Sequence, residues 1–521
     1  MSASGRKQTS PFTQAMSALP AKADVERHDW HVSFVPRAVF GPTNLAFCRS
    51  PYNAAVADRF RWLRCGHCAV GQPTVGTATF IDARGCPGAP TPSLAIYEND
   101  TEGSMRGHGL KVRIIGAGTG GLCLAQGLKK DHVEVEVYER DRSPSDRLQG
   151  YRLSISETGR RALKACLPEA LLEKLIENSA KPSETVSFLD HSLNRLLVIE
   201  LSHSDRKDET SELPISRIAL RHILIEGLDD IIHYGKKFVA FEDAPQDAVT
   251  ARFEDGSSTT GDVLIGADGA GSRLRAQLLP HARRVETGVV AVSGKVSLND
   301  DVRRATPQAI LRGPTLILGP RGCFMFSSTV DYEVAAGGEH DYDREKYVMW
   351  GFSAHDDTLH LSVNVDAISG QDAIAAVIAL MDNWHPALRR LVQITDASTV
   401  AAFPIRTSVP IPAWPTQKVT LLGDALHNMT PFRGIGANTA LRDAEALRQA
   451  LVAAARGEAD LIQALAAYEQ DMIKYGFTAV QTSLKHMQRF HAKGTLARAA
   501  TKAIFQVVDS VPPLKAAFLG R

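Results

Sequence analysis

The hydrophobic pattern is clearest in residues 111–141, where two apolar runs flank a segment of helical length. The first run is nearly continuous and the second alternates with polar residues, which predicts two strands: Val112, Ile114 and Ile115, then Val133, Val135 and Val137. Residues 122–130 between the two runs predict a helix. The pattern therefore predicts a strand-helix-strand unit of the kind found in α/β folds.

Three glycines, Gly116, Gly118 and Gly121, occupy the turn between the first strand and the helix. The first permits a tight turn, the second lets the backbone approach a pyrophosphate at the helix N-terminus, and the third allows close helix–sheet packing. Glu139 ends the second strand, where a carboxylate can accept hydrogen bonds from ribose hydroxyls. The unit predicts an adenine-dinucleotide site and by itself leaves FAD and NAD open.

Two arginines farther along the chain are candidate cofactor contacts. Arg152 lies in a short predicted strand, residues 151–155, and can reach a phosphate or a ribose, although a surface charge is the alternative. Arg217 follows Ser216 in the first turn of a predicted helix, where its side chain can swing to a ligand.

Asp268 follows a predicted buried strand, Val263–Ile265, and is flanked by Gly269 and Gly271. Open α/β sheets place ligand contacts at such strand ends, so Asp268 is a candidate binding residue. An Asx turn without a ligand is the alternative. Before this strand, residues 249–253 and the Asp255-Gly256 turn predict a hairpin.

A period of two prevails in residues 285–400 and predicts an antiparallel sheet with one face covered. The alternation predicts two strands in particular: one through Val348, Trp350 and Phe352, and one through Leu359, Leu361, Val363 and Val365. Four aromatic residues are candidate walls of a substrate pocket, with an ordinary core role as the alternative: Phe324, Phe326, Trp350 and Phe352.

The last dense motif begins with a predicted strand at residues 419–422, which ends at Gly423 and Asp424. Asp424 can accept a hydrogen bond from a ribityl hydroxyl. The loop at residues 431–436 and the positive N-terminus of the helix after it can stabilise an anionic flavin ring. His427 is predicted to hold the turn rather than to act as an acid or base.

The composition is that of an ordinary globular protein, with 521 residues, 44% hydrophobic and 22% charged. This length allows two or three domains, and the net charge of +1 argues against nucleic acid as a partner. No apolar run of membrane-spanning length occurs, and the N-terminus lacks the apolar core of a signal peptide. We therefore expect a cytoplasmic protein without a membrane span.

Residues 1–104 show no sustained period and are rich in Pro, Gly, Ser, Thr and Ala, which predicts a disordered extension. Met105 lies six residues before the first core strand, so the working protein is hypothesised to begin there. Cys65 and Cys68 are spaced like half a zinc site, but no second pair follows, and no metal is predicted.

Three motifs in this order resemble those of the class A flavin monooxygenases, the family of para-hydroxybenzoate hydroxylase: GAGTGG with Glu139, GADGAGSRLR, and GDALHNMTPFRGIGANTALRDA. The resemblance covers roughly residues 110–475. It implies an α/β fold in which a Rossmann-like FAD-binding domain is interleaved with an antiparallel-sheet substrate domain and followed by C-terminal helices. The implied division is 105–284, with some substrate-domain segments, and 401–456 for the FAD-binding domain, 285–400 for the substrate sheet and 457–521 for the helices.

The resemblance implies non-covalent FAD and a set of cofactor-binding residues, with Gly436 and Ala437 beside the flavin ring. The full set is Gly116, Gly118, Gly121, Glu139, Arg152, Arg217, Asp268, Asp424, Gly436 and Ala437. It names no catalytic side chain.

The implied function is an FAD-dependent monooxygenase that uses NADPH or NADH and O₂ to hydroxylate or epoxidise a small apolar or aromatic substrate. Such an enzyme would serve secondary metabolism or aromatic catabolism. Baeyer–Villiger insertion, the choice between NADPH and NADH, the substrate and the oligomeric state stay open. The alternatives are an FAD-dependent oxidase or reductase that inserts no oxygen, and a flavoprotein that only sequesters a ligand.

Overall fold

The computed structural model describes residues 109–144, 146, 151–201, 212–332, 345–360 and 365–518. All of them belong to one compact unit. The predicted extension at residues 1–104, with Cys65 and Cys68, lies outside the described residues.

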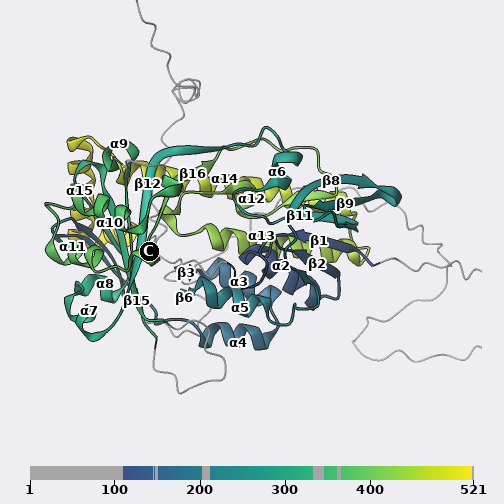
Figure 1. The fold of residues 1–521 in the computed structure, drawn as a ribbon, viewed down its shortest axis with the longest axis horizontal. Helices are drawn as coiled ribbons and strands as arrows, with labels where there is room; N and C mark the ends of the chain where they lie inside the picture. Colours follow the sequence, from purple (N-terminus) through teal and green to yellow (C-terminus); the bar gives the residue numbers. More distant parts are fainter. Residues whose placement is uncertain are drawn as a thin grey trace, which may run out of the picture. The chain divides into compact units, whose positions relative to one another are not determined.

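A five-stranded parallel sheet contains the predicted strand-helix-strand unit (Figure 1). Its order is β17-β11-β1-β2-β7, and the bounds are Lys111–Ile115 for β1, Glu134–Tyr138 for β2, Ile232–His233 for β7, Val263–Gly266 for β11 and Val419–Leu421 for β17. Strand β11 pairs with β1 on one side and with β17 on the other. Segments about 150 residues apart in the chain are therefore neighbours in this sheet.

Helices pack against this sheet because their apolar residues face it, and together they form the largest apolar core. These helices are α2 (Thr119–Lys130), α3 (Glu157–Cys166), α4 (Glu169–Glu177), α5 (Arg217–Ile225), α13 (Gly436–Ala455) and α14 (Leu461–Phe490). Helix α13 packs against α2, α3 and α14.

A second, seven-stranded sheet has the order β16-β12-β15-β14-β13-β4-β5. Its strands are β4 (Thr185–Asp190), β5 (Arg195–Glu200), β12 (Arg284–Ser297), β13 (Thr315–Leu318), β14 (Phe324–Val330), β15 (Tyr347–His355) and β16 (Ala401–Ser408). Its pairings are antiparallel except for β4 with β13. The predicted antiparallel sheet is therefore present, and it also takes strands from residues 185–200 and 401–408.

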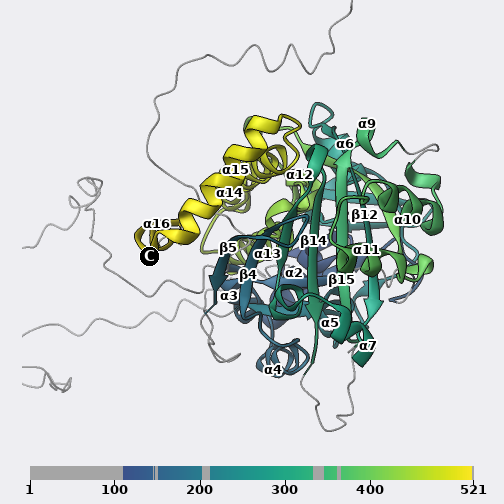
Figure 2. The ribbon, with the colours of Figure 1, turned by 90° about the vertical axis from the view of Figure 1, so that its left-hand side faces the viewer.

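Helices cover both faces of the seven-stranded sheet. One face packs against α7 (Asp300–Ala305), α8 (Gln308–Arg312), α10 (Gly370–Ala379) and α11 (Pro386–Gln393), and Figure 2 shows α10 and α11 in front of its strands. The other face packs against α14 and α15 (Thr495–Ser510), where Phe324 contacts Phe490. We call this second face the inner face, defined by Phe324, Phe326 and Ser328 of β14.

Smaller elements make up the remaining secondary structure of the described residues. They comprise the pair β3 (Arg152–Ile155) and β6 (Leu213–Ser216), the meander β8 (Phe238–Ala244), β9 (Ala248–Phe253) and β10 (Ser258–Gly261), the helices α6 (Arg273–Leu278), α9 (Asp356–Leu359), α12 (Asp424–His427) and α16 (Pro512–Phe518), and 3₁₀ turns at Pro245–Asp247, Pro320–Gly322, Val365–Ala367, Ala397–Thr399 and Pro431–Arg433 (η6). The predicted hairpin is confirmed as β9 and β10.

The predicted strand through Leu359 and Val365 is wrong at both ends. Leu359 ends helix α9 and Val365 begins a 3₁₀ turn, while Leu361 and Val363 lie outside the described residues. Acidic residues Asp356 and Asp357 favour a helix N-terminus here, and His360 leaves the helix in a left-handed conformation at φ 45°. Alternation over a few residues cannot separate a strand from a helical turn followed by a loop.

Candidate cofactor and substrate site

The three predicted motifs meet at one edge of the five-stranded sheet, where β1, β11 and β17 end side by side. The amide of Ala267, just after β11, donates to the carbonyl of Ile115 at 2.8 Å. The amide of Leu422, just after β17, donates to the carbonyl of Gly266 at 3.0 Å. Since the carboxyl ends of parallel strands share an edge, the residues that follow these strands gather at one place.

Two glycines of the first turn are required by close approach of the backbone. Gly116 has φ +110°, and a Cβ there would lie 2.5 Å from the carbonyl oxygen of Ala267. A Cβ on Gly121 would lie 2.3 Å from the carbonyl oxygen of Gly116. The turn can therefore pack against the end of β11 only with glycine at both positions.

The third glycine, Gly118, has open space around it and precedes the first turn of α2. No acidic residue occupies that turn, so the amides at the helix N-terminus are suited to an anion such as a pyrophosphate. Glu139 lies beside them and is 7% exposed. Its carboxylate accepts from the amides of Ala117 at 2.7 Å and Asp141 at 3.0 Å, which fixes its orientation.

Asp268 lies next to Gly116 and is oriented by the start of α6. One carboxylate oxygen accepts from the amide of Arg273 at 2.9 Å. The other is buried and has no hydrogen-bond partner among the described residues. Burial raises the pKa of Asp268, although its hydrogen bonds lower it. The carboxylate thus caps a helix, as in the Asx-turn alternative, and its other oxygen is left without a partner among the described residues.

Asp424 is the first residue of α12 and is exposed at the same sheet edge. It makes no hydrogen bond or ion pair with another described residue, and Arg284 lies close enough to interact electrostatically. The preceding Gly423 has φ +65° and turns the chain out of β17. The Asp424 carboxylate is therefore accessible to solvent and takes no part in packing.

A buried carboxylate, Asp443 of α13, holds this turn from beneath. It is 0% exposed and accepts from the amide of Gly423 at 2.7 Å and from the hydroxyl of Tyr475 at 2.6 Å. His427 Nε2 lies 2.7 Å from the same carboxylate. Burial lowers the pKa of His427, but Asp443 raises it, and the net pKa lies above the ordinary value.

These contacts agree with the predicted structural role of His427, and they identify Asp443, which the sequence reading missed. A signal was available, because Asp443 lies four residues before the apolar Leu447 on the inward stripe of α13. A charge on such a stripe indicates a buried partner, since an unpaired buried carboxylate is costly.

The N-terminus of α13 follows a tight loop in which Gly434 has φ +62°. Gly436 and Ala437 begin the helix and are half-buried. Asn438 ties this end to β3 and α3, since it donates to the carbonyl of Ser154 at 2.8 Å and accepts from the amide of Ser156 at 2.9 Å. Asn438 was also missed, and its position in the first turn of a helix was the available signal.

The two candidate arginines lie close in the structure but differ in their contacts. Arg152 pairs with Ser216 between β3 and β6, and Arg217 follows directly. The Arg152 guanidinium is buried, donates to Ser328 Oγ at 2.7 Å and lies 3.5 Å from Glu212. Arg217 is exposed at the start of α5. Some of the N–H donors of Arg152 are thus already used by protein groups, whereas the Arg217 side chain is exposed.

The four aromatic candidates separate by face. Trp350 and Phe352 are 0% exposed and pack in the core against α10 and α11, so their prediction as pocket walls is wrong. Phe324 packs against Phe432 of η6 with ring centroids 5.4 Å apart. Phe326 on the inner face is the one of the four that is only partly buried.

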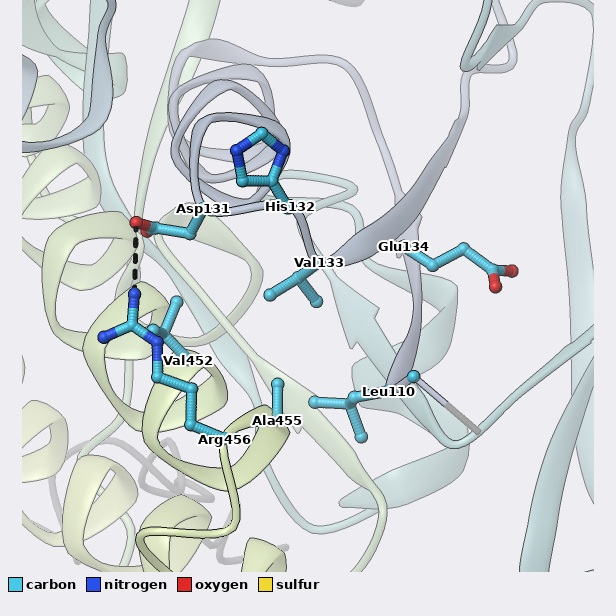
Figure 3. A pocket seen from close by; sticks show the side chains of 9 residues that line it. Leu110, Asp131, His132, Val133, Glu134, Val452, Ala455 and Arg456 are labelled. Carbon is cyan, nitrogen blue, oxygen red and sulfur yellow. Dashed lines mark ion pairs between the residues drawn. The ribbon is translucent and has the colours of Figure 1, made fainter. Parts of the chain in front are cut away.

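A separate surface pocket lies at the opposite end of the five-stranded sheet (Figure 3). It is lined by Leu110 before β1, by Val133 and Glu134 at the start of β2, and by Arg456 after α13, which lies 4.0 Å from Asp131. Because ligand contacts in such sheets lie at the carboxyl ends of the strands, this pocket is not part of the candidate site.

Two further properties concern the described residues alone. They contain no group of three or more His, Cys, Asp and Glu that could hold a metal ion. None of their helices is long and apolar enough to cross a membrane.

Comparison with protein families decides the class of the cofactor. A family model described as an FAD binding domain matches residues 109–483, which is most of the chain and includes all three motifs. The chain belongs to the FAD-dependent monooxygenase family. The predicted resemblance is thereby confirmed, and FAD rather than NAD is the cofactor of the dinucleotide site.

Two curated fungal relatives of this monooxygenase family are similar to the chain. The dual O-methyltransferase/FAD-dependent monooxygenase elcB of Phaeosphaeria nodorum is 31% identical, over 70% of this chain and 42% of the relative. The FAD-dependent monooxygenase dbaB of Emericella nidulans is 31% identical, over 66% of this chain and 87% of the relative. The chain thus spans less than half the length of elcB.

Solved structures have the same fold. A protein from Photorhabdus luminescens subsp. laumondii is 34% identical, with a TM-score of 0.67 over 74% of this chain and 100% of that chain. HpxO of Klebsiella pneumoniae, solved with FAD and uric acid, is 24% identical, with a TM-score of 0.65 over 78% of this chain and 96% of that chain. The predicted α/β monooxygenase fold is confirmed.

The residues of this monooxygenase chain fit FAD. The open backbone at Gly118 and the N-terminus of α2 suit its pyrophosphate, and Glu139 lies where ribose hydroxyls would come. The exposed carboxylate of Asp424 suits the ribityl chain, and the free oxygen of Asp268 provides a second acceptor. The half-buried start of α13 is suited to the flavin ring.

Proposed function

We propose that this chain is an FAD-dependent monooxygenase that uses NADPH or NADH and O₂ to hydroxylate or epoxidise a small apolar or aromatic substrate. The observation that carries the proposal is the meeting of three motif ends, at Gly116, Asp268 and Asp424, on one sheet edge. Membership of the monooxygenase family supports the same activity. Secondary metabolism or aromatic catabolism is the proposed setting.

In this proposal the protein supplies binding and orientation. Gly116, Gly118, Gly121 and Glu139 hold the ADP half of FAD, Asp424 holds the ribityl chain, and Gly436 and Ala437 lie beside the flavin ring, with Arg152, Arg217 and Asp268 as further contacts. FAD, when bound, supplies the electron transfer from the nicotinamide and the activation of O₂. No side-chain acid or base is assigned.

The inner face of the seven-stranded sheet is the proposed surface for the substrate, because contacts from it reach the cofactor elements. Phe324 contacts Phe432 directly before α13, and Ser328 accepts from Arg152. A substrate held between this face and the flavin would be positioned for oxygen transfer and shielded from water.

The domain division stated above, with residues 1–104 outside the working protein, is part of the proposal. A cytoplasmic location is also proposed. The proposed partners are a small-molecule substrate and O₂.

The purified protein is expected to be yellow and to release FAD into the supernatant on acid precipitation. The physical reason is that all assigned contacts are hydrogen bonds, helix-end amides and packing. Absorbance and mass spectrometry of supernatant and pellet check this. A flavin that stays attached to the precipitated chain would contradict non-covalent binding.

Oxygen insertion is tested by NADPH oxidation under ¹⁸O₂ with a panel of phenols, followed by mass spectrometry of the products. A product that carries one ¹⁸O atom supports a monooxygenase. Hydrogen peroxide as the sole product, with every substrate intact, would indicate an oxidase. A protein that binds FAD and ligand but oxidises no NADPH or NADH would indicate a sequestering flavoprotein.

A further inference from the structure

Gly351 lies on the inner face of the seven-stranded sheet, on its third strand. It lies on β15, between β12 and β14, and pairs in register with Phe326 on one side and Ser293 on the other. Directly paired residues of an antiparallel sheet point to the same side, so Gly351 belongs to the inner face with Phe326.

Contacts at two places attach the inner face to neighbouring elements, including those of the cofactor site. At one end Phe324 packs on Phe432 of η6, and Ser353 beside it hydrogen-bonds His491 at 2.9 Å. At the other end Ser328 Oγ accepts from Arg152 Nη1. Phe324 and Ser328 lie four positions apart on β14, which is about 13 Å along an extended strand.

The position between these two contacts is open. A Cβ built on Gly351 would meet no atom within 4 Å, and Phe326 beside it is only partly buried. Gly294 on the neighbouring strand gives a comparison on the opposite face, where a Cβ would lie 2.9 Å from Thr395 and 3.0 Å from Trp350. The space above Gly351 is therefore specific to the inner face.

The borders of this space are apolar on one side and hydroxylic on the other. Phe326 borders it from β14, and Ser293, whose hydroxyl hydrogen-bonds Tyr151, borders it from β12. Phe403 of β16 lies on the same face and is 41% exposed. A flat ring lying on the glycine would contact an aromatic edge and could hydrogen-bond a hydroxyl.

The two nearest cations by register already have protein partners. Lys295 lies two residues beyond Ser293 on the same face of β12 and forms an ion pair with Glu345. Arg152 bonds Ser328, Ser183 and Glu212. A carboxylate in this space would lack a free cation as partner, and a buried unpaired charge is costly, so an uncharged ligand is favoured.

We propose that Gly351 is a specificity-determining residue, whose missing side chain makes room for a flat, uncharged, hydroxylated aromatic ring between Phe326 and Ser293. The inference rests on the proposed function, since it places the ring opposite the flavin. It narrows the substrate class from small apolar or aromatic molecules to neutral phenols.

The test compares 2-naphthol with 2-naphthoate as probes, using the FAD-loaded protein and the change in flavin absorbance on titration. The wild type is expected to bind 2-naphthol at least about tenfold more tightly than 2-naphthoate. In Gly351→Leu the added side chain fills the space, and 2-naphthol affinity is expected to fall by roughly tenfold or more. FAD affinity should be unchanged, because Gly351 contacts no cofactor motif.

Gly494→Leu is the matched control, since Gly494 lies before the first turn of α15 and a Cβ there would meet only Ala497 at 3.9 Å. It should bind 2-naphthol as the wild type does. A second variant, Gly351→Cys, should be alkylated by iodoacetamide and protected by 2-naphthol, as measured on the peptide by mass spectrometry. This readout does not depend on a colour change of the flavin.

Three results would overturn the inference while leaving the proposed function intact: tighter binding of 2-naphthoate, undiminished 2-naphthol binding by Gly351→Leu, or no 2-naphthol binding by an FAD-loaded wild type. Failure of the proposed function looks different. If the wild-type protein binds no FAD while Gly351→Cys is still alkylated and still protected by 2-naphthol, the proposed function fails. The aromatic site is supported in that case.

Discussion

Asp443→Ala is expected to lower the free energy of unfolding by about 3–5 kcal/mol, the typical cost of removing one partner from a buried charged network. Asp443 is 0% exposed, and the amide of Gly423, the Tyr475 hydroxyl and His427 all meet it. Without the carboxylate, the buried His427 ring, the Gly423 amide and the Tyr475 hydroxyl lose their shared partner. Urea denaturation of the apoprotein, followed by circular dichroism, measures the loss.

Tyr475→Phe is the graded comparison for this prediction. It removes only one donor and leaves the carboxylate with His427 and Gly423, so the expected loss is smaller, about 1.5–3 kcal/mol. Equal losses in the two variants, or a loss below about 1 kcal/mol for Asp443→Ala, would mean that the network does not hold the turn.

Asp424→Ala is expected to weaken FAD binding by roughly 10- to 150-fold, which corresponds to a charge-assisted hydrogen bond of about 1.5–3 kcal/mol. The carboxylate is exposed and pairs with no other described residue, so its removal should leave the unfolding free energy of the apoprotein nearly unchanged. Titration of apoprotein with FAD, followed by flavin fluorescence, gives the affinity.

Asp300→Ala is the control for Asp424→Ala, because Asp300 is also an exposed first residue of a short helix, α7, but lies on the seven-stranded sheet's helical layer. Its FAD affinity should match the wild type. If Asp424→Ala also binds FAD normally, the ribityl assignment fails. If it unfolds at lower urea than Asp300→Ala, the carboxylate has a packing role that its exposure does not indicate.

The sequence predicted the cofactor half of the molecule well because its signals are local. The alternation of Val133, Val135 and Val137 and the spacing of Gly116, Gly118 and Gly121 lie within one short segment and match β2 and the turn before α2. Glycine is required there because the backbone of another strand comes too close for a side chain. A Cβ on Gly116, for example, would lie 2.5 Å from the carbonyl oxygen of Ala267.

What the sequence did not predict depends on partners far along the chain. Alternation in β15 separates Trp350 and Phe352 from Gly351, but it cannot say which side faces the cofactor elements. Asp443 was missed because Tyr475 lies 32 residues away, on the next helix. The apolar pattern at Leu359–Val365 failed because a charged helix start and a left-handed residue override a weak strand signal.

The position of β11 between β1 and β17 sets the order in which this protein can acquire its cofactor during synthesis. The N-terminal motif ends at Ile115, but its neighbours come from residues near 263 and 419, and α13 starts only at Gly436. At about 5–20 residues per second, a ribosome needs roughly 15–65 s to pass from the first motif to the last. The first glycine turn gains its packing partner when β11 is made, about halfway through that interval, whereas the sheet edge assigned to the flavin is complete only after β17 and α13.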